Sequence, residues 1–415
     1  MKICFLSYRG DMYCGGQGIY LYHITNELHK MGHHIEVIAG PPYPEVAEGI
    51  TLHKIKSSST YHHNIPNIRE SLKILLNPLD LYDYLSSRLG FFSEPMIFTI
   101  KAYFKLKELV SQGRVDIIHD NQSLGYGLLM MKSLNVPVVA TIHHPVLIDK
   151  DADLAQARSF RERWSRKKFY FSFAPMQSFV SKRVDKVITV SQHAAYEINR
   201  LFGVPKNMIK VVYNGIDIDL FKRQDDTPKK PNSLIMVART EDRKKGLLYL
   251  VQALKILLTQ NRKVNLTIID KFPDEDGYAP CLINEYDLDG TVTITGRVTR
   301  EELVQYYSSS EIAIVPSLYE GFGFPAAEAM SCSVPVISTR AGALPEVIGN
   351  DSAGILIPPK DPHSLAEAIK MLLDDHVYRT KIGTNARKRV EEHFTWELAA
   401  KEILRIYGEL LACSQ

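Results

Sequence analysis

The chain alternates short apolar runs with amphipathic segments from one end to the other. The runs are rich in Val and Ile, which is typical of buried parallel strands, whereas the segments between them repeat their apolar residues at helical spacing. The first half predicts strands at 3–7, 34–39, 116–119, 136–141 and 186–190, with helices at 18–31 and 124–134. The second half predicts strands at 233–238, 264–269, 291–295, 312–316, 334–339 and 354–357, with helices at 246–257, 300–308 and 325–331. This alternation predicts a doubly wound α/β fold with parallel sheets and helices on both faces.

Two similar domains are expected from the length of the chain and from one internal sequence similarity. A chain of 415 residues is too long for a single core. Val136–Thr141 and Val334–Thr339 share their form, a strand entered through proline and closed by threonine. Gly203 and Pro205 interrupt a helix between the halves, so we predict domains at 1–205 and 206–395. The amphipathic segment 396–415 predicts a terminal helix.

Composition excludes several classes of protein. No run of about 18 apolar residues occurs, so no membrane span is predicted. The apolar stretch at the start is too short for a secretory signal. The five cysteines are scattered without metal-ligand spacing, which favours a reducing, cytoplasmic setting and no structural zinc. A formal net charge of +3 gives no reason to expect nucleic acid as a partner.

The positive charge is unevenly distributed. Residues 1–205 carry 24 Lys and Arg against 18 Asp and Glu, and the surplus is concentrated at 158–186, where aromatic residues are interleaved. Two interpretations stay open for this stretch. It is a core-packing helix with a solvated basic face, or, together with the apolar cluster at 75–104, a surface that contacts anionic lipid.

A Gly-rich turn with two carboxylates follows the apolar run at 312–316. Its sequence, Glu320-Gly-Phe-Gly-Phe-Pro-Ala-Ala-Glu328, predicts a turn followed by a helix, since proline suits the first helical positions. A helix N-terminus attracts phosphate, and carboxylates accept hydrogen bonds from hydroxyls. The segment therefore favours a ligand that is part phosphate and part sugar.

Three further candidates follow predicted strands. Gly15-Gly-Gln-Gly18 could bring main chain to a diphosphate, or could be a tight structural turn. Arg239 and Lys245, in a loop after the strand at 233–238, could clamp a diphosphate, or could belong to a solvated basic loop. His143 follows the strand at 136–141 and is a candidate site residue. His119, also at a strand end, is the alternative candidate.

Other residues have simpler explanations. Ser191 is expected to be a helix N-cap. Asp217 and Asp219 resemble a metal-binding pair, but they follow an Asn-Gly turn signal and need no metal. A nicotinamide-binding oxidoreductase is a competing class, disfavoured because the glycine fingerprint is missing and Glu36 lies inside its strand and not at the strand end.

Taken in order, these motifs resemble those of family 4 retaining glycosyltransferases of the GT-B fold, including bacterial nucleotide-sugar-dependent glycosyl- and mannosyltransferases. The resemblance implies two Rossmann-like domains facing each other across a cleft, with the last helix crossing back to the first domain. The resemblance covers almost the whole chain, and among its matching segments are 212–221, 295–298, 318–330, 334–338 and 342–347. One segment departs from the family pattern, since Asp270-Lys271-Phe272 stands where a glycine is usual.

The resemblance also implies a role for each matching residue. Glu320 would hold hydroxyls of the donor sugar and Glu328 those of the ribose. Arg239 and Lys245 would stabilise the departing diphosphate, and His143 would lie over the donor sugar. Main-chain groups would come from the residues Gly16, Gly18, Gly321, Phe322, Gly323 and Phe324, with Val298 near the nucleotide base.

The expected reaction is transfer of a hexose from a UDP- or GDP-sugar to a hydroxyl, with retained anomeric configuration. Because no carboxylate of the first half is placed as a nucleophile, we expect front-face transfer, with no metal and no cofactor. The acceptor is left open between a lipid-linked hydroxyl, a cell-envelope glycan and a small soluble molecule. The expected location is the cytoplasm or the inner face of the cell membrane. A catalytically inactive relative that only binds sugar nucleotides is the remaining alternative.

Overall fold

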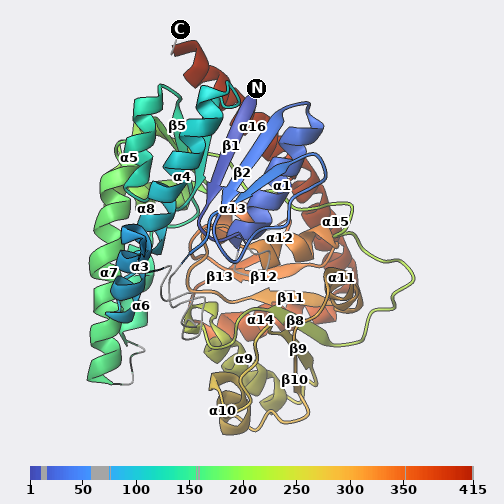
Figure 1. Ribbon diagram of the computed structural model, residues 1–415. Coiled ribbons are helices and arrows are strands. Elements are labelled where there is room, and N and C mark those ends of the chain that lie inside the picture. The colour runs from blue at the N-terminus through green and yellow to red at the C-terminus, as the bar shows by residue number, and fades with distance from the viewer. Residues whose placement is uncertain are drawn as a thin grey trace. The chain divides into compact units, whose positions relative to one another are not determined.

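The computed structural model describes residues 1–10, 16–57, 74, 76–155, 157, 159–350 and 352–413. The chain divides into two units, one made of residues 1–212 and 399–415 and the other of residues 213–398. Each unit is a parallel sheet flanked by helices (Figure 1). The predicted architecture of two Rossmann-like α/β domains is therefore confirmed. The last helix, α16 (Trp396–Cys413), begins in the second unit and returns to the first.

The first unit is built on a seven-stranded sheet in the order β3-β2-β1-β4-β5-β6-β7, with every pair parallel. Its strands are β1 (Lys2–Ser7), β2 (His34–Ala39), β3 (Thr51–Lys54), β4 (Ile117–Asn121), β5 (Val138–Ile142), β6 (Lys186–Thr189) and β7 (Ile209–Val211). Its α-helices, besides α16, are α1 (Gly16–Lys30), α3 (Pro78–Arg88), α4 (Glu94–Ser111), α5 (Gly127–Met131), α6 (Leu147–Ala155), α7 (Phe160–Ser181) and α8 (Gln192–Phe202).

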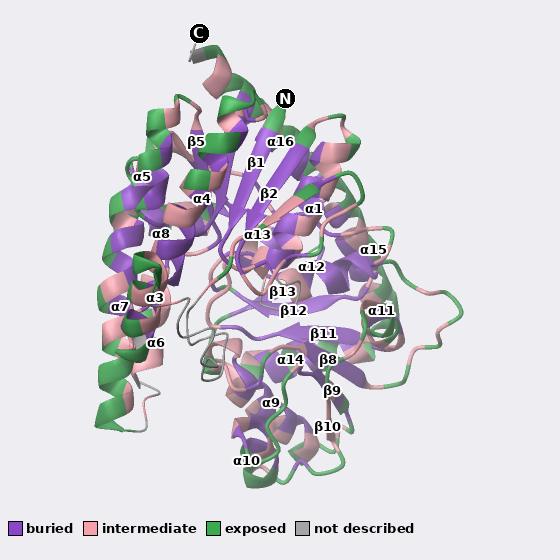
Figure 2. Ribbon diagram, in the orientation of Figure 1, coloured by how far each residue is buried: buried purple, intermediate pink, exposed green. Residues whose placement is uncertain are grey.

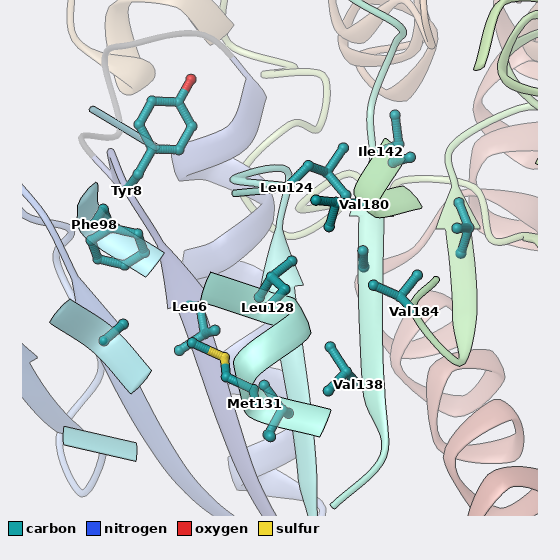
Figure 3. Packing of buried hydrophobic residues seen from close by; sticks show 14 of the residues in the cluster. Leu6, Tyr8, Phe98, Leu124, Leu128, Met131, Val138, Ile142, Val180 and Val184 are labelled. Carbon is teal, nitrogen blue, oxygen red and sulfur yellow. The ribbon is translucent and has the colours of Figure 1, made fainter. Parts of the chain in front are cut away.

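The core of this unit lies between the sheet and the helices α4, α5 and α7. Leu6, Leu124, Leu128 and Val138 are fully buried there and point into one continuous apolar cluster (Figure 3). Burying each such side chain contributes about 1.5–3 kcal/mol to folding. The strands are buried on both faces, which explains why they appear in the sequence as unbroken apolar runs and do not alternate with polar residues.

The second unit is built on a six-stranded parallel sheet in the order β10-β9-β8-β11-β12-β13. Its strands are β8 (Ser233–Val237), β9 (Asn265–Ile269), β10 (Val292–Thr295), β11 (Ile312–Val315), β12 (Val336–Thr339) and β13 (Ile355–Ile357). Its α-helices are α9 (Leu247–Thr259), α10 (Tyr278–Glu285), α11 (Arg300–Ser309), α12 (Phe324–Ser331), α13 (Leu344–Ile348), α14 (Pro362–Asp374) and α15 (His376–His393).

The strand orders locate the functional edge of each sheet. In the second unit the chain builds outward from β8 through β9 and β10, then restarts beside β8 with β11 and builds the other way. The first unit does the same, with the reversal between β1 and β4. At such a reversal the loops that follow the two central strands diverge, and ligands of open α/β sheets bind there.

The sequence predicted the central strands closely but gave no clear elements between residues 55 and 105. The structure forms α3 and α4 in that region, while residues 58–73 and Leu75 lie outside the described part of the chain. The strand β3 was also missed, because its Thr-Leu-His-Lys sequence holds one apolar residue at a half-exposed sheet edge. Among the helices that the structure describes, none is both long enough and apolar enough to cross a membrane.

Candidate active site

The loop between β8 and α9 carries four cationic side chains at the reversal point of the second sheet, and Arg239 and Lys245 are the two candidates among them. Arg239 is exposed and has no ion-pair partner among the described residues. Asp242 caps the short turn at 243–245 by accepting from the Lys244 N–H at 3.0 Å. Gly246 then starts α9 with φ of +73°, and a side chain there would meet the Pro316 carbonyl oxygen at 2.0 Å. Only glycine therefore lets this loop pack against the β11 loop.

The loop between β11 and α12 brings Glu320 to the same place. The Leu318 N–H donates to the Lys244 carbonyl at 2.6 Å, which ties the two loops together. The Ser317 hydroxyl donates to Glu320 Oε1 at 2.8 Å. Gly342, with φ of +58°, leaves room for the Glu320 main chain, whose carbonyl accepts from the Ala343 N–H at 2.9 Å.

Lys245 and Glu320 form an ion pair across the two loops. Lys245 Nζ lies 2.8 Å from Glu320 Oε1, and the two side chains are 25% and 11% exposed. The pair is thus partly shielded from water but still reachable by a ligand. The sequence predicted a cation and a carboxylate in one site, and the structure brings these two residues, 75 positions apart, into direct contact.

The N-terminus of α12 follows Glu320 directly. Gly323 precedes the helix with φ of +106°, and Pro325 occupies its first turn. Phe322 is buried, and its ring packs edge-on against Phe324 with 5.3 Å between centroids. This packing holds the main chain of Gly321 to Phe324 in place at the start of α12. The positive end of the helix dipole lies there.

Glu328 lies one turn further along α12 and is buried. Loss of hydration raises the pKa of its carboxyl to about 7, while Arg300 and a hydrogen bond from Tyr307 partly oppose the rise. The Tyr307 hydroxyl lies 3.4 Å from Glu328 Oε2. A buried carboxylate with one long hydrogen bond can accept further bonds from ligand hydroxyls.

Two other loops complete this edge of the second sheet. Val298 lies half-buried in the loop between β10 and α11. Asp270, at the position where the sequence departs from the expected glycine, is fully buried and accepts from the Thr240 N–H and hydroxyl at 2.7 and 2.6 Å. Asp270 therefore fixes the main chain next to Arg239. The sequence gave no sign of this role beyond the departure itself.

In the first unit, the candidate residues follow β1 and β5. Helix α1 begins at Gly16, and Gly18 is buried in its first turn, whereas Gly15 lies outside the described residues. His143 follows β5 and is 8% exposed. Its main-chain N–H donates to Gln122 Oε1 at 2.7 Å.

Asn121, at the end of β4, links the first turn of α1 to His143. Its Nδ2 donates to the Gln17 carbonyl at 3.1 Å, and its Oδ1 lies 2.9 Å from His143 Nε2. Because an amide oxygen only accepts, His143 carries its proton on Nε2 and leaves Nδ1 as an acceptor. Burial, with His144 nearby, lowers the pKa of His143 to about 3, so the ring is neutral. The sequence did not single out Asn121, since a polar residue ending a strand is common.

His119 is a core residue and not a rival for the site. It is fully buried between the hydroxyls of Tyr407 and Thr141, the latter 2.6 Å from Nε2. Tyr407 lies on α16, so this contact anchors the last helix to the first sheet.

The remaining candidates keep structural roles. Ser191 caps α8 by accepting from the Ala194 N–H at 3.0 Å, as predicted. Asp217 accepts from the Leu220 N–H at 3.1 Å, which is a turn contact. Glu36 is buried within β2 and pairs with Arg114 and, at 2.7 Å, with His53, so it does not stand at a strand end as a dinucleotide site requires.

The structure thus brings the candidates together as two groups. One contains Arg239, Lys245, Glu320 and the main chain of 321–324 on loops of the second unit, with Glu328 on α12. The other contains Gly16 and Gly18 in the first turn of α1 and His143 after β5. The second-unit group combines cations, helix-end N–H groups and carboxylates, which can bind a phosphate and hydroxyls side by side.

Comparison with known proteins agrees with this chemistry. Residues 217–389 match the family model described as Glycosyl transferases group 1, and residues 14–220 match that described as Glycosyltransferase Family 4. A relative from Mycolicibacterium hassiacum, named MMP α-(1→4)-mannosyltransferase, is 34% identical over 99% of both chains.

Solved structures share the fold over the whole chain. Sucrose-phosphate synthase from Thermosynechococcus elongatus superposes with a TM-score of 0.74 at 25% identity, covering 99% of both chains. HepE from Anabaena, solved in complex with UDP-glucose, superposes with a TM-score of 0.70 at 19% identity, covering 99% of this chain and 100% of its own.

Proposed function

The chain belongs to the family 4 glycosyltransferases, and from that premise we propose that it transfers a hexose from a UDP- or GDP-sugar to a hydroxyl acceptor. The observation that carries the proposal is the Lys245–Glu320 pair, 2.8 Å apart at the reversal point of the second sheet, with Arg239 on the same loop as Lys245. A nucleoside diphosphate sugar presents anionic phosphates next to hydroxyls, and this group of residues offers a partner for each.

In this proposal each second-unit residue acts on one part of the donor. Arg239 and Lys245 bind the diphosphate, and the N–H groups of Gly321 to Phe324 bind sugar or phosphate. Glu320 accepts hydrogen bonds from sugar hydroxyls, Glu328 accepts them from the ribose, and Val298 contacts the base. The relative HepE, which shares the fold, binds UDP-glucose.

The first unit supplies Gly16, Gly18 and His143 to the same reaction. The main chain at the two glycines approaches the leaving diphosphate, and neutral His143 accepts a hydrogen bond from the donor sugar through Nδ1. Because its pKa is about 3, His143 is not the proton acceptor at neutral pH. Its role is to orient the sugar.

The reaction proceeds on one face of the sugar. The bond between the anomeric carbon and the diphosphate oxygen breaks, the acceptor oxygen bonds to that carbon, and the acceptor proton passes to the departing phosphate oxygen. The configuration of the donor is retained. Cationic side chains and helix-end N–H groups stabilise the developing negative charge, which is usually the largest catalytic contribution, so no metal is needed.

The relative's name supports mannose as the transferred sugar and an α linkage to a 4-hydroxyl of the acceptor. We propose a lipid-linked or cell-envelope acceptor and a location in the cytoplasm or at the inner face of the membrane. A small soluble acceptor is the second candidate. An inactive sugar-nucleotide-binding relative is disfavoured because Arg239, Lys245 and Glu320 lie on the loops that follow β8 and β11, and Glu328 lies on α12, which follows the second of these loops.

A nucleotide screen tests the proposal. UDP or GDP should raise the melting temperature, whereas NAD should not, and one sugar donor among UDP-, GDP- and ADP-hexoses should be slowly hydrolysed without acceptor. Binding without any donor turnover would favour the inactive relative. Stabilisation by NAD alone would contradict the proposal and favour the oxidoreductase.

A further inference from the structure

A hollow of about 750 Å³ lies in the first unit against α7, with α6 and α8 contributing to its walls. This volume is within the range of about 300–1,000 Å³ that small-molecule sites occupy. Its lining is dominated by hydrocarbon and aromatic groups, among them Phe91, Leu147, Leu154, Trp164, Phe171 and Leu201. None of these residues has been given a role in the transfer.

The polar groups of the lining are poorly suited to a sugar. The Tyr170 hydroxyl already donates to Asp153, and the Ser178 hydroxyl donates to the Phe202 carbonyl at 3.0 Å. Among the lining residues that the structure describes, none carries a carboxylate or a side-chain amide. Because sugar hydroxyls need such acceptors, the hollow fits a hydrocarbon chain better than a glycan.

Three lysines give the lining its charge. Lys168 donates to the Leu89 carbonyl at 3.1 Å, which holds it beside the hollow. Lys150 and Lys167 are exposed, and neither has a hydrogen-bond or ion-pair partner among the residues that the structure describes. The charged residues of the described lining are all cationic, and an apolar hollow with such a lining is complementary to an apolar chain that ends in an anionic head.

The hollow also lies close to the candidate site of its own unit. Leu147, in its wall, is the first residue of α6 and follows His143 by four positions. Since consecutive Cα atoms are about 3.8 Å apart, the Cα atoms of these two residues are separated by at most about 15 Å. A molecule with its chain in the hollow can therefore extend its head towards His143.

We propose that this hollow binds the hydrocarbon chain of an anionic amphiphile, and that this amphiphile is the acceptor of the transfer. The second part rests on the proposed function, whereas the first part does not. The occupant is one molecule held in a cavity, which differs from a membrane held against a surface. Exposed residues recur along α7 (Figure 2). A membrane contact would instead use the outermost aromatic residues of this helix, such as Phe160, which is 83% exposed.

Tryptophan fluorescence gives a direct binding assay. The chain has two tryptophans, Trp164 in the hollow and the buried Trp396. In a Trp396→Phe variant the signal reports Trp164 alone. Titration with dodecyl phosphate, below the concentration at which it forms micelles, should shift this emission to the blue and saturate. Dodecyltrimethylammonium, with the same chain and opposite charge, should bind at least tenfold more weakly.

Chain length and two variants test the location. Affinity should rise about fourfold per methylene, or about 200-fold from octyl to dodecyl phosphate. Phe171 is 78% exposed, so Phe171→Ser should leave the fold intact but weaken binding at least tenfold, as should Lys167→Glu. Phe179→Ser, on the same helix at a position that is 42% exposed and outside the lining, is the matched control and should bind as the parent does.

Three results would overturn the proposal. Absence of saturable binding excludes the site, and equal loss in Phe179→Ser and Phe171→Ser places the chain elsewhere on α7. Flotation with anionic vesicles but no binding of monomeric dodecyl phosphate would assign the surface to a membrane.

The acceptor assignment has its own readout. With a donor that the enzyme turns over, a dodecyl mannoside that carries a phosphate should show a KM at least a hundredfold below that of methyl mannoside carrying the same phosphate, and Phe171→Ser should remove the difference. Equal KM values would contradict the assignment. If no donor is turned over, the proposed function fails, while the dodecyl phosphate titration still decides whether the hollow binds a chain.

Discussion

At the scale of single residues, the account depends on one cation that is held by a carboxylate. Lys245 is fixed by Glu320 at 2.8 Å, while its neighbour Arg243 is exposed and lies over the Tyr278 ring at 4.8 Å. The two residues carry the same charge two positions apart. Their different surroundings make them a matched pair for testing which cation acts on the donor.

We expect Lys245→Ala to lower kcat about 10²- to 10³-fold, because one stabilising donor to the leaving diphosphate is lost. The Arg243→Ala control should retain kcat within a factor of about two. Steady-state turnover of the sugar donor measures both. Equal losses in the two variants would mean that the loop acts only through its overall charge.

Glu328 predicts a pH effect on stability. Burial raises its pKa from 4.5 to about 7, so between these values the folded chain holds a proton that the unfolded chain has released. Its contribution is therefore fully present below about pH 4.5 and is lost as the pH rises through about 7. The loss is of the order of 3 kcal/mol.

Glu328→Gln, which cannot ionise, should remove that dependence. The difference in unfolding free energy between the variant and the parent should grow in favour of the variant from pH 5 to pH 7.5, as measured by urea denaturation. Parallel stability curves for the two proteins would show that Glu328 does not titrate in this range.

Which residues the sequence could predict depended on their neighbours along the chain. Glu320 and Glu328 lie in one distinctive segment, and Arg239 and Lys245 lie in another, so both were found. Asn121 and Asp270 were missed as functional residues. Each acts through a partner on another strand, Asn121 through His143 and Asp270 through Thr240, and no local pattern records such contacts.

At the scale of elements, the site depends on how closely two loops of the second sheet approach each other. Gly246 lies where the β8 loop crosses the β11 loop. Its φ is +73°, and a Cβ there would lie 2.0 Å from the Pro316 oxygen, so there is no room for a side chain. The Lys244–Leu318 main-chain bond and the Lys245–Glu320 pair both depend on this crossing.

Gly246→Ala should therefore destabilise the protein by more than about 2 kcal/mol and reduce donor turnover with it. Gly408, inside α16, is the control, because a Cβ added there would have no described atom of another part of the chain within 4 Å. Gly408→Ala should stabilise the helix by about 0.5–1 kcal/mol and leave turnover unchanged. Thermal denaturation of both variants provides the comparison, and a neutral Gly246→Ala would contradict the close crossing.

The predicted elements were accurate where burial dictates sequence. The strands β1, β2, β8 and β11 are buried on nearly every residue, so their apolar runs set their bounds to within a residue or two. Edge strands such as β3 and β7 are half-exposed and left no such run. The stretch 158–186 became α7, whose inner residues join the core and whose outer face carries the exposed aromatic and basic side chains.

At the scale of the whole molecule, two sheets with the same reversal of strand order each present loops at their central strands. The alternation of elements along the chain was sufficient to predict this architecture. The identity of the acceptor was not predictable in the same way, because the hollow against α7 forms only when side chains of α6, α7 and α8 and the distant Phe91 pack together in the folded chain.

The most direct test of the central claim follows the anomeric carbon itself. The protein is incubated with an α-linked nucleoside diphosphate hexose and a hydroxyl acceptor in the presence of EDTA, and the first-formed glycoside is observed by proton NMR. The account predicts an α-glycoside, formed at an undiminished rate in EDTA and at least a hundredfold more slowly by Lys245→Ala. A β-glycoside, or transfer that stops in EDTA, would contradict it.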